Sequence, residues 1–196
     1  MSWRPSIRSF LSLTLINPTV ALVAKTGVSP NLVTVLSFLV GLVAAYLLAQ
    51  GLFLVGALAV LLSGALDLLD GALARATGKV SPFGALLDST LDRLTEGAYL
   101  FGLLWFYLQG GSVLEVLLIY LTLLGSLLIS YVRARSEGLG IQGDVGILAR
   151  GERLVILALG LLLGRVTLAL WVLVLLILVT FLQRLVYSLR QARNIH

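Results

Sequence analysis

The chain has 196 residues, of which 59% are hydrophobic, and a formal net charge of +5. A soluble domain of this length could not bury so much apolar surface, so the composition indicates an integral membrane protein, which we expect to form a single domain. The apolar runs are continuous, which excludes the alternating strands of a membrane β-barrel, and the absence of cysteine excludes disulfides and thiolate metal sites.

The first segment is basic and only partly apolar. Arg4 and Arg8 precede a short apolar run, as in a signal peptide, but Asn17-Pro18 interrupts that run and no small-residue cleavage site follows. We therefore expect residues 1–28 to form an amphipathic helix that lies in the membrane interface, and we prefer this interpretation to a signal peptide.

Six long apolar segments follow, each separated from the next by residues rich in Gly, Pro or Ser. Each is close to the roughly 20 residues that a helix needs to cross a bilayer, although the fifth is marginal. The segments are 31–50, 52–76, 83–108, 112–136, 147–164 and 167–189. The sequence therefore predicts an all-α fold in which a bundle of six transmembrane helices occupies residues 29–196.

The charged residues are distributed unevenly about these segments. If all six segments cross, every Lys and Arg except Arg165 lies at one membrane face, and so does every Asp and Glu except Glu115. The positive-inside rule makes this face cytoplasmic. We expect a multi-pass protein of the cell membrane with both termini in the cytoplasm and no nucleic-acid partner. The single histidine, His196, ends the chain, and we expect no role for it.

Four aspartates lie on the second and third segments. Asp67 and Asp70 are three residues apart, and Asp88 and Asp92 are four apart, so each pair shares one face of a helix. The connection between the two helices is short, which makes them antiparallel neighbours and brings the four carboxylates together. Solvated helix ends are a poor explanation, because Asp67 and Asp92 both lie more than two turns from the connection.

The nearby cations cannot neutralise these carboxylates. Arg75 and Arg93 could balance only half of the charge, and an unpaired carboxylate at membrane depth costs several kcal/mol. Divalent cations would supply the deficit, and ligands that are all oxygen favour Mg²⁺ or Mn²⁺ over Zn²⁺. Gly71, Ala74 and Gly84 share the aspartate faces, where they serve either close helix packing or space for a flat ligand.

This pattern resembles the signature of the CDP-alcohol phosphotransferase family. The matching residues are Asp67, Asp70, Gly71, Ala74, Arg75, Gly84, Asp88 and Asp92. The resemblance implies an enzyme in which an alcohol attacks the lipid-side phosphorus of a CDP-activated lipid and releases CMP. It also implies two divalent ions, one held by Asp67, Asp70 and Asp88 and one by Asp67, Asp88 and Asp92. Asp92 would be the general base, and the protein would be a homodimer.

The resemblance further implies a set of contacts to the CDP group. These residues are Pro30, Asn31, Leu32, Val33, Thr34, Gly71, Ala74, Arg75, Ser81 and Gly84. The segment that begins at Ser29-Pro30 can also be explained as an ordinary helix start, and both interpretations remain open.

The acceptor alcohol is predicted from the remaining arginines. Arg133 and Arg153 lie on two helices beside the aspartates, and paired arginines suit a phosphate monoester. We interpret Arg135 and Arg150 as ordinary anchors at the cytoplasmic face.

A second resemblance supports a phosphorylated acceptor. The chain is similar to the branch of the family that acts on inositol phosphate, through Ser130, Tyr131, Arg133, Ala134, Arg135, Glu152 and Arg153. This implies CDP-diacylglycerol and inositol phosphate as substrates. The expected phosphate ligands are Ser130, Arg133, Arg153 and Arg184, with Arg190 or Arg193 as alternatives to the last.

Three other functions would explain part of the pattern. Glycerol 3-phosphate, the acceptor in phosphatidylglycerophosphate synthesis, is also an anionic phosphate monoester. A divalent-cation channel or transporter would explain intramembrane acids, but the acids occupy only the cytoplasmic half and no inverted repeat is evident. A non-catalytic assembly protein would not need the complete signature.

Overall fold

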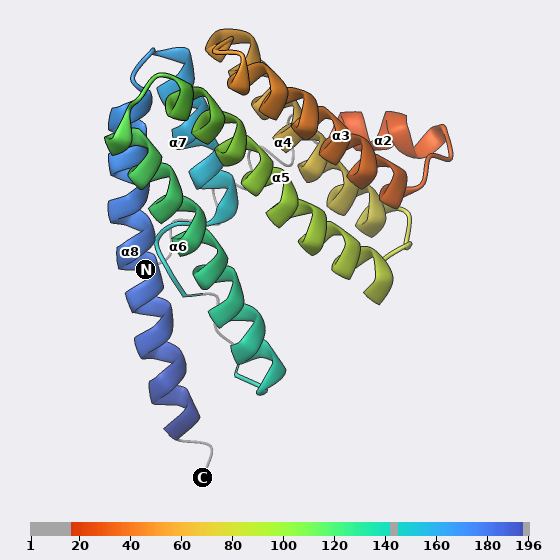
Figure 1. Ribbon diagram of the computed structural model, residues 1–196. Coiled ribbons are helices and arrows are strands. Elements are labelled where there is room, and N and C mark those ends of the chain that lie inside the picture. The colour runs from red at the N-terminus through yellow and green to blue at the C-terminus, as the bar shows by residue number, and fades with distance from the viewer. Residues whose placement is uncertain (1–16, 142–144, 194–196) are drawn as a thin grey trace.

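The computed structural model describes residues 17–141 and 145–193 (Figure 1). Most of the expected interfacial helix, and His196, lie outside the described residues. Within them, the first helix is α2 (Asn17–Lys25), which begins at the Asn17-Pro18 pair that was expected to interrupt the segment. Proline is tolerated in the first turn of a helix because its missing N–H has no partner there.

Six further helices follow, and the described residues contain no strand, which confirms the all-α class. They are α3 (Pro30–Ala49), α4 (Phe53–Ala76), α5 (Pro82–Gln109), α6 (Val113–Gly138), α7 (Arg150–Leu162) and α8 (Val166–Arg193). Among the described helices, α3, α4, α6 and α8 are long and apolar enough to cross a membrane. The first half of α5 carries Asp88, Asp92, Arg93 and Glu96, and α7 has only 13 residues.

The helix ends follow from local sequence. Ser29 and Ser81 are the N-caps of α3 and α5, where each side chain accepts a hydrogen bond from a backbone N–H and is followed by proline. Each predicted break also carries at least one glycine with positive φ. Gly78, between α4 and α5, has φ 67°, a conformation that disfavours any residue with a Cβ.

The helices form two groups that α7 links (Figure 1). Helices α3, α4 and α5 pack together, α6 packs along α8, and α5 meets α6. Helix α7 contacts both α4 and α8, so the chain that begins at Arg150 enters between the two groups. This placement brings the polar start of α7 against the aspartate-bearing helices.

Small residues set the closest helix crossings. A Cβ at Gly102 of α5 would overlap the carbonyl oxygen of Ala45 on α3, so only glycine fits this crossing. Helices α3 and α4 are also joined by reciprocal hydrogen bonds. Ser37 Oγ donates to the Ser63 carbonyl at 2.8 Å, and Ser63 Oγ donates to the Ser37 carbonyl at 2.9 Å.

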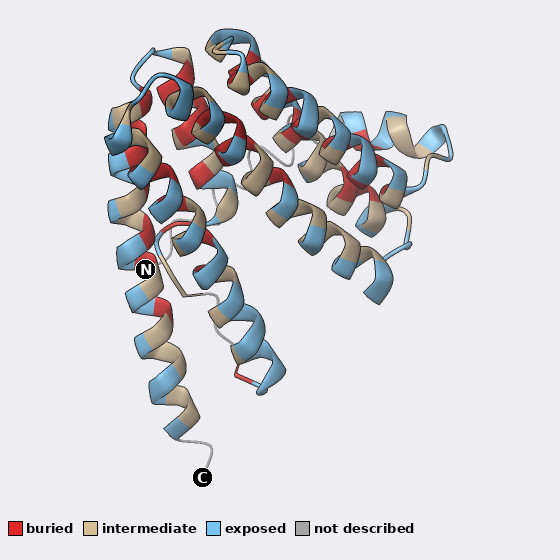
Figure 2. Ribbon diagram, in the orientation of Figure 1, coloured by how far each residue is buried: buried red, intermediate tan, exposed pale blue. Residues whose placement is uncertain are grey.

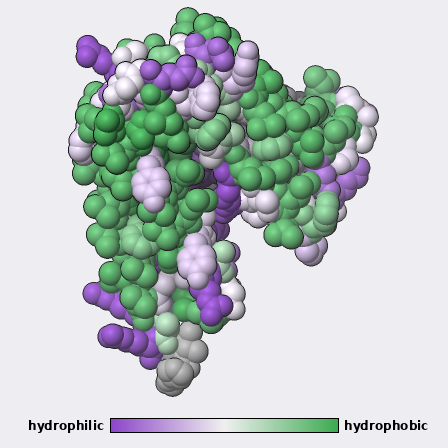
Figure 3. All heavy atoms as spheres, viewed as in Figure 1, coloured by the Kyte–Doolittle hydropathy of each residue, from purple (hydrophilic) through white to green (hydrophobic). Residues whose placement is uncertain are grey.

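The outer faces of the helices are apolar. Large leucine, valine and aromatic side chains are exposed along most helices, while the buried residues line the contacts between helices (Figure 2). The space-filling view shows the same apolar surface, with hydrophilic side chains gathered in the recess between α6 and the α3–α5 group and at the ends of the helices (Figure 3). This distribution is that of a membrane protein.

Candidate active site

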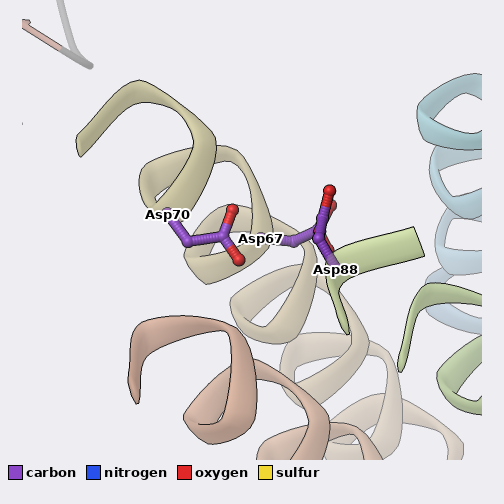
Figure 4. Close-up of side chains that lie close together, drawn as sticks. All are labelled: Asp67, Asp70 and Asp88. Atoms are coloured by element: carbon purple, nitrogen blue, oxygen red, sulfur yellow. The ribbon is translucent and has the colours of Figure 1, made fainter. Parts of the chain in front are cut away.

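Three aspartates from two helices form a cluster. Asp67 and Asp70 extend from α4 and Asp88 from α5, and one carboxylate oxygen of each lies within 4.8 Å of the others (Figure 4). We call these three residues the aspartate cluster. Three of the four aspartates that the sequence predicted to converge thus form the aspartate cluster, and the fourth, Asp92, lies beside Asp67.

The aspartate cluster fits a divalent cation. Asp70 is only 3% exposed, and within the described part of the chain its Oδ2 atom is buried without a hydrogen-bond partner. Three carboxylates that face one another at this spacing repel unless a cation lies between them. Their hard oxygen donors match Mg²⁺ or Mn²⁺.

Asp92 lies one turn beyond Asp88 and has a different partner. Its Oδ1 is 2.6 Å from Arg150 Nη1, and the same nitrogen is 2.7 Å from Asp67 Oδ2. The interpretation of Arg150 as an ordinary anchor is therefore wrong, because the packing of α7 against α4 directs its side chain into the site. The three-residue spacing of Arg150 and Arg153 was the sequence signal, since it puts both on one face of α7.

A second buried ion pair lies beside the first. Arg153 Nε and Nη2 contact the two carboxylate oxygens of Glu96 at 2.7 and 2.8 Å, and Arg153 is only 5% exposed. Glu96 is one turn beyond Asp92 on α5. The four-residue spacing from Asp92 puts Glu96 on the aspartate face of this helix, whereas its pairing with Arg153 depends on the packing of α7.

A small hollow of about 20 Å³ adjoins both arginines. It is lined by side chains of α5, α6, α7 and α8, and its volume is roughly that of one water molecule. The lining residues are Glu96, Tyr99, Leu100, Thr122, Arg150, Arg153, Leu154, Leu157 and Leu173.

The residues expected to bind the CDP group lie at the starts of α3 and α5 and at the end of α4. A Cβ at Gly84 would be 3.0 Å from Asn31 Oδ1 and 3.2 Å from Ser81 Oγ, so these three residues are neighbours. Thr34, which is buried, interacts with the carboxylate of Asp70. The expected CDP-binding region therefore adjoins the aspartate cluster through the contact of Thr34 with Asp70.

The other members of that set differ in exposure. Pro30 is buried and its carbonyl accepts a hydrogen bond from Thr34, whereas Leu32 is half exposed. Val33 packs with Leu73 in a small apolar cluster.

Near the end of α4, the small residues border an exposed arginine. Gly71 adjoins the Arg75 guanidinium, which would be 3.4 Å from an added Cβ, and Ala74 is partly buried. The side chain of Arg75 is exposed.

The residues expected to bind the acceptor phosphate are more dispersed. Arg133 is exposed on α6, where its Nε contacts Glu137 at 2.8 Å, and the Ser130 hydroxyl donates to the Ser126 carbonyl at 3.0 Å. Ser130 and Arg133 thus both contact other residues of α6.

Arg184 is buried on α8 and connects two other parts of the chain. Its Nε and Nη1 atoms donate to the carbonyl oxygens of Val145 and Ile129 at 3.0 and 3.1 Å. Arg184 thus ties α8 to α6 and to the segment before α7.

The chain is similar to known proteins in sequence and in fold. The chain is 42% identical over 165 residues to an archaetidylinositol phosphate synthase of Pyrococcus horikoshii, which covers 82% of this chain and 84% of the relative. The fold is similar to two crystal structures of Mycobacterium tuberculosis phosphatidylinositol phosphate synthase, both 32% identical to this chain. The structure with CDP-DAG bound has a TM-score of 0.80 and covers 89% of this chain and 93% of its own. The complex with manganese and citrate has a TM-score of 0.81 and covers 89% and 88%.

The family comparison spans nearly all of the described helices. Residues 27–189 match the CDP-alcohol phosphatidyltransferase family. This range includes the aspartate cluster, Asp92 and both buried ion pairs. The chain belongs to the CDP-alcohol phosphatidyltransferase family.

Proposed function

We propose that this protein transfers the phosphatidyl group of CDP-diacylglycerol to inositol phosphate, which yields phosphatidylinositol phosphate and CMP. The observation that carries the proposal is the convergence of Asp67, Asp70 and Asp88 within 4.8 Å in a chain of this family. Support for the substrates comes from relatives, because one solved relative holds CDP-DAG and the relatives from two domains of life are named as synthases of inositol-phosphate lipids.

The proposed cofactors are two divalent cations, Mg²⁺ or Mn²⁺. Manganese in a solved relative and the free oxygen of Asp70 support a cation at the aspartate cluster. Asp67, Asp88 and Asp92 would hold the second ion. When bound, such ions neutralise pyrophosphate charge and stabilise the charge that develops on a leaving group.

In the proposed reaction, the acceptor hydroxyl oxygen forms a bond to the lipid-side phosphorus. The bond between this phosphorus and the oxygen bridging to CMP breaks, and CMP leaves with that oxygen. Asp92 accepts the hydroxyl proton, for which it must be released from Arg150. The remaining proposed CDP contacts, centred on Asn31, Ser81 and Gly84, hold the nucleotide beside the aspartate cluster.

The proposed acceptor pocket uses Ser130, Arg133, Arg153 and Arg184. Arg153 lies beside the aspartates, because its partner Glu96 is one turn from Asp92 on α5. Glu96 holds two nitrogens of the guanidinium and thereby fixes its orientation, which suits a directional contact to phosphate.

We also propose a single domain with six membrane crossings and an N-terminal interfacial helix. Two helices fall short of a span by these criteria, α5 because of its charged residues and α7 because it has only 13 residues, and both contribute charged residues to the site. The site and both termini would lie in the cytoplasm, and the apolar outer faces of α5 and α6 would form a homodimer interface. Light scattering in detergent would measure the oligomeric state.

The test is CMP release by the purified protein in detergent micelles with Mg²⁺. Acceptors are inositol 1-phosphate, free inositol and glycerol 3-phosphate, each with CDP-diacylglycerol and with its ether-linked archaeal counterpart. We expect CMP and an inositol-phosphate lipid only with inositol 1-phosphate, and none when a chelator is in excess or in Asp88→Asn. Turnover with glycerol 3-phosphate alone would reject the acceptor, and full activity in chelator would reject the cation requirement.

A further inference from the structure

Arg150 holds a position between two carboxylates of different helices. A single nitrogen, Nη1, contacts Asp67 Oδ2 on α4 and Asp92 Oδ1 on α5 at 2.7 and 2.6 Å. Within the described part of the chain, its Nε is buried and has no hydrogen-bond partner. The guanidinium is therefore held in place by these two ion pairs, which both depend on one nitrogen.

This position divides the acidic residues into two parts. The three oxygens of the aspartate cluster face one another within 4.8 Å, and the recorded ion pairs of Arg150 involve Asp67 Oδ2 and Asp92 but neither Asp70 nor Asp88. Asp70 and Asp88 therefore offer a first cation oxygens that Arg150 does not contact, so this cation can bind while Arg150 stays in place. A cation between Asp67 and Asp92 cannot, because it would compete with Nη1 for the same oxygens and be repelled by its charge.

We propose that Arg150 is an exchangeable counter-ion that a second divalent cation must displace. This inference rests on the proposed function, which assigns a second ion to Asp67, Asp88 and Asp92. Displacement frees Asp92 from its ion pair and moves the guanidinium toward the hollow that Arg150 already borders with Glu96 and Arg153. Binding of the second ion is therefore coupled to the position of a positive charge beside the acceptor pocket, and the coupling is reciprocal.

The test is Mn²⁺ binding to the detergent-purified protein without substrates, with free Mn²⁺ measured by electron paramagnetic resonance. We expect the parent to bind one ion tightly and a second weakly. Arg150→Gln should tighten the second class about ten- to a hundredfold, because the competing charge-assisted contacts are gone. Arg150→Lys keeps a charge within reach of both carboxylates and should bind nearly as the parent does. Lys79→Gln removes one charge from an exposed site on the α4–α5 connection and should leave both classes unchanged.

The outcomes separate the possibilities. Arg150→Gln that binds Mn²⁺ as the parent does, or more weakly, would overturn the counter-ion role, and so would Arg150→Lys that behaves like Arg150→Gln. If Arg150→Gln is folded with Mn²⁺ and unfolds on chelation while the parent and Arg150→Lys stay folded, the role is supported. A parent that binds no Mn²⁺ and forms no CMP would reject the proposed function itself, whereas normal CMP release with unchanged Arg150→Gln affinity rejects only this inference.

Discussion

Asp67 is the residue on which the charges of the site converge. Its carboxylate belongs to the aspartate cluster, and its Oδ2 accepts a hydrogen bond from Arg150 Nη1, 83 residues away in the chain. Asp70 and Asp88 complete the cluster on one side, and Asp92 shares Arg150 on the other. Removing any one of these carboxylates therefore changes the charge that the remaining groups must balance.

Asparagine at each of the four positions tests this dependence. We expect Asp67→Asn, Asp70→Asn, Asp88→Asn and Asp92→Asn each to lower the rate of CMP release about a hundredfold or more, because asparagine keeps the shape and removes the charge. Glu115→Gln is the control, since Glu115 accepts a hydrogen bond from Thr167 near the other ends of the helices, away from the aspartates. Two aspartate variants that are folded and turn over normally would contradict the two-ion assignment.

Arg153 can be removed without leaving Glu96 as an unpaired buried charge. In a Glu96→Gln background, Arg153→Ala should raise KM for inositol phosphate about ten- to a hundredfold, the value of one charge-assisted contact. KM for CDP-diacylglycerol should change little, because the proposed nucleotide contacts come from α3, α4 and α5. The measurement is steady-state kinetics with each substrate varied in turn, compared with Glu96→Gln alone. An effect confined to the CDP-lipid would place the acceptor pocket elsewhere.

The sequence predicted which acidic residues lie in the site better than it predicted which basic residues do. The spacing of Asp67, Asp70 and Asp88 is local, and two neighbouring helices are enough to bring them together. The role of Arg150 depends on how α7 packs against α4, which no local pattern specifies. A basic residue near a helix start also has a ready explanation as a membrane anchor, so the arginine that enters the site could not be distinguished from those that do not.

At the scale of elements, the sequence predicted the six helices α3 to α8, of which four are long and apolar enough to cross a membrane, but not the shortness of α7. The predicted segment was 147–164, but α7 spans only Arg150–Leu162. Residues 147–149 precede the helix, and α7 ends before the turn at Gly164. The other ends agree to within a few residues with the Gly, Pro and Ser breaks. Contacts between helices were less predictable, because the sequence does not show which glycines lie at a close helix crossing and which do not.

The crossing of α3 and α5 gives a prediction at this scale. Gly102→Ala should lower stability by about 1–3 kcal/mol, because its Cβ would overlap the Ala45 carbonyl oxygen and the backbones would have to separate. Gly97→Ala on the same helix is the matched control, since its nearest neighbour is Leu123 Cδ1 at 3.8 Å. Thermal unfolding in detergent compares the two, and equal Tm values would show that the crossing yields easily.

At the scale of the molecule, the proposed orientation can be read from labelling. The chain has no cysteine, so single-cysteine variants report one position each. In intact bacterial cells, a membrane-impermeant maleimide should label Arg165→Cys, between α7 and α8, and leave Lys79→Cys unlabelled until the cells are permeabilised. Both residues are exposed in the structure. The reverse labelling pattern would show that the site faces the other side of the membrane.

The length of α7 bears on how a lipid substrate reaches the site. Its 13 residues span about 20 Å, roughly 10 Å less than the hydrocarbon core of a bilayer. A tight turn joins its far end to α8, so the shortfall comes at the end that carries Arg150. In the proposed orientation the acidic site is therefore recessed below the level of the surrounding head groups. A donor lipid can then enter sideways from its own leaflet, and its acyl chains need not leave the hydrocarbon for its phosphates to meet the aspartates.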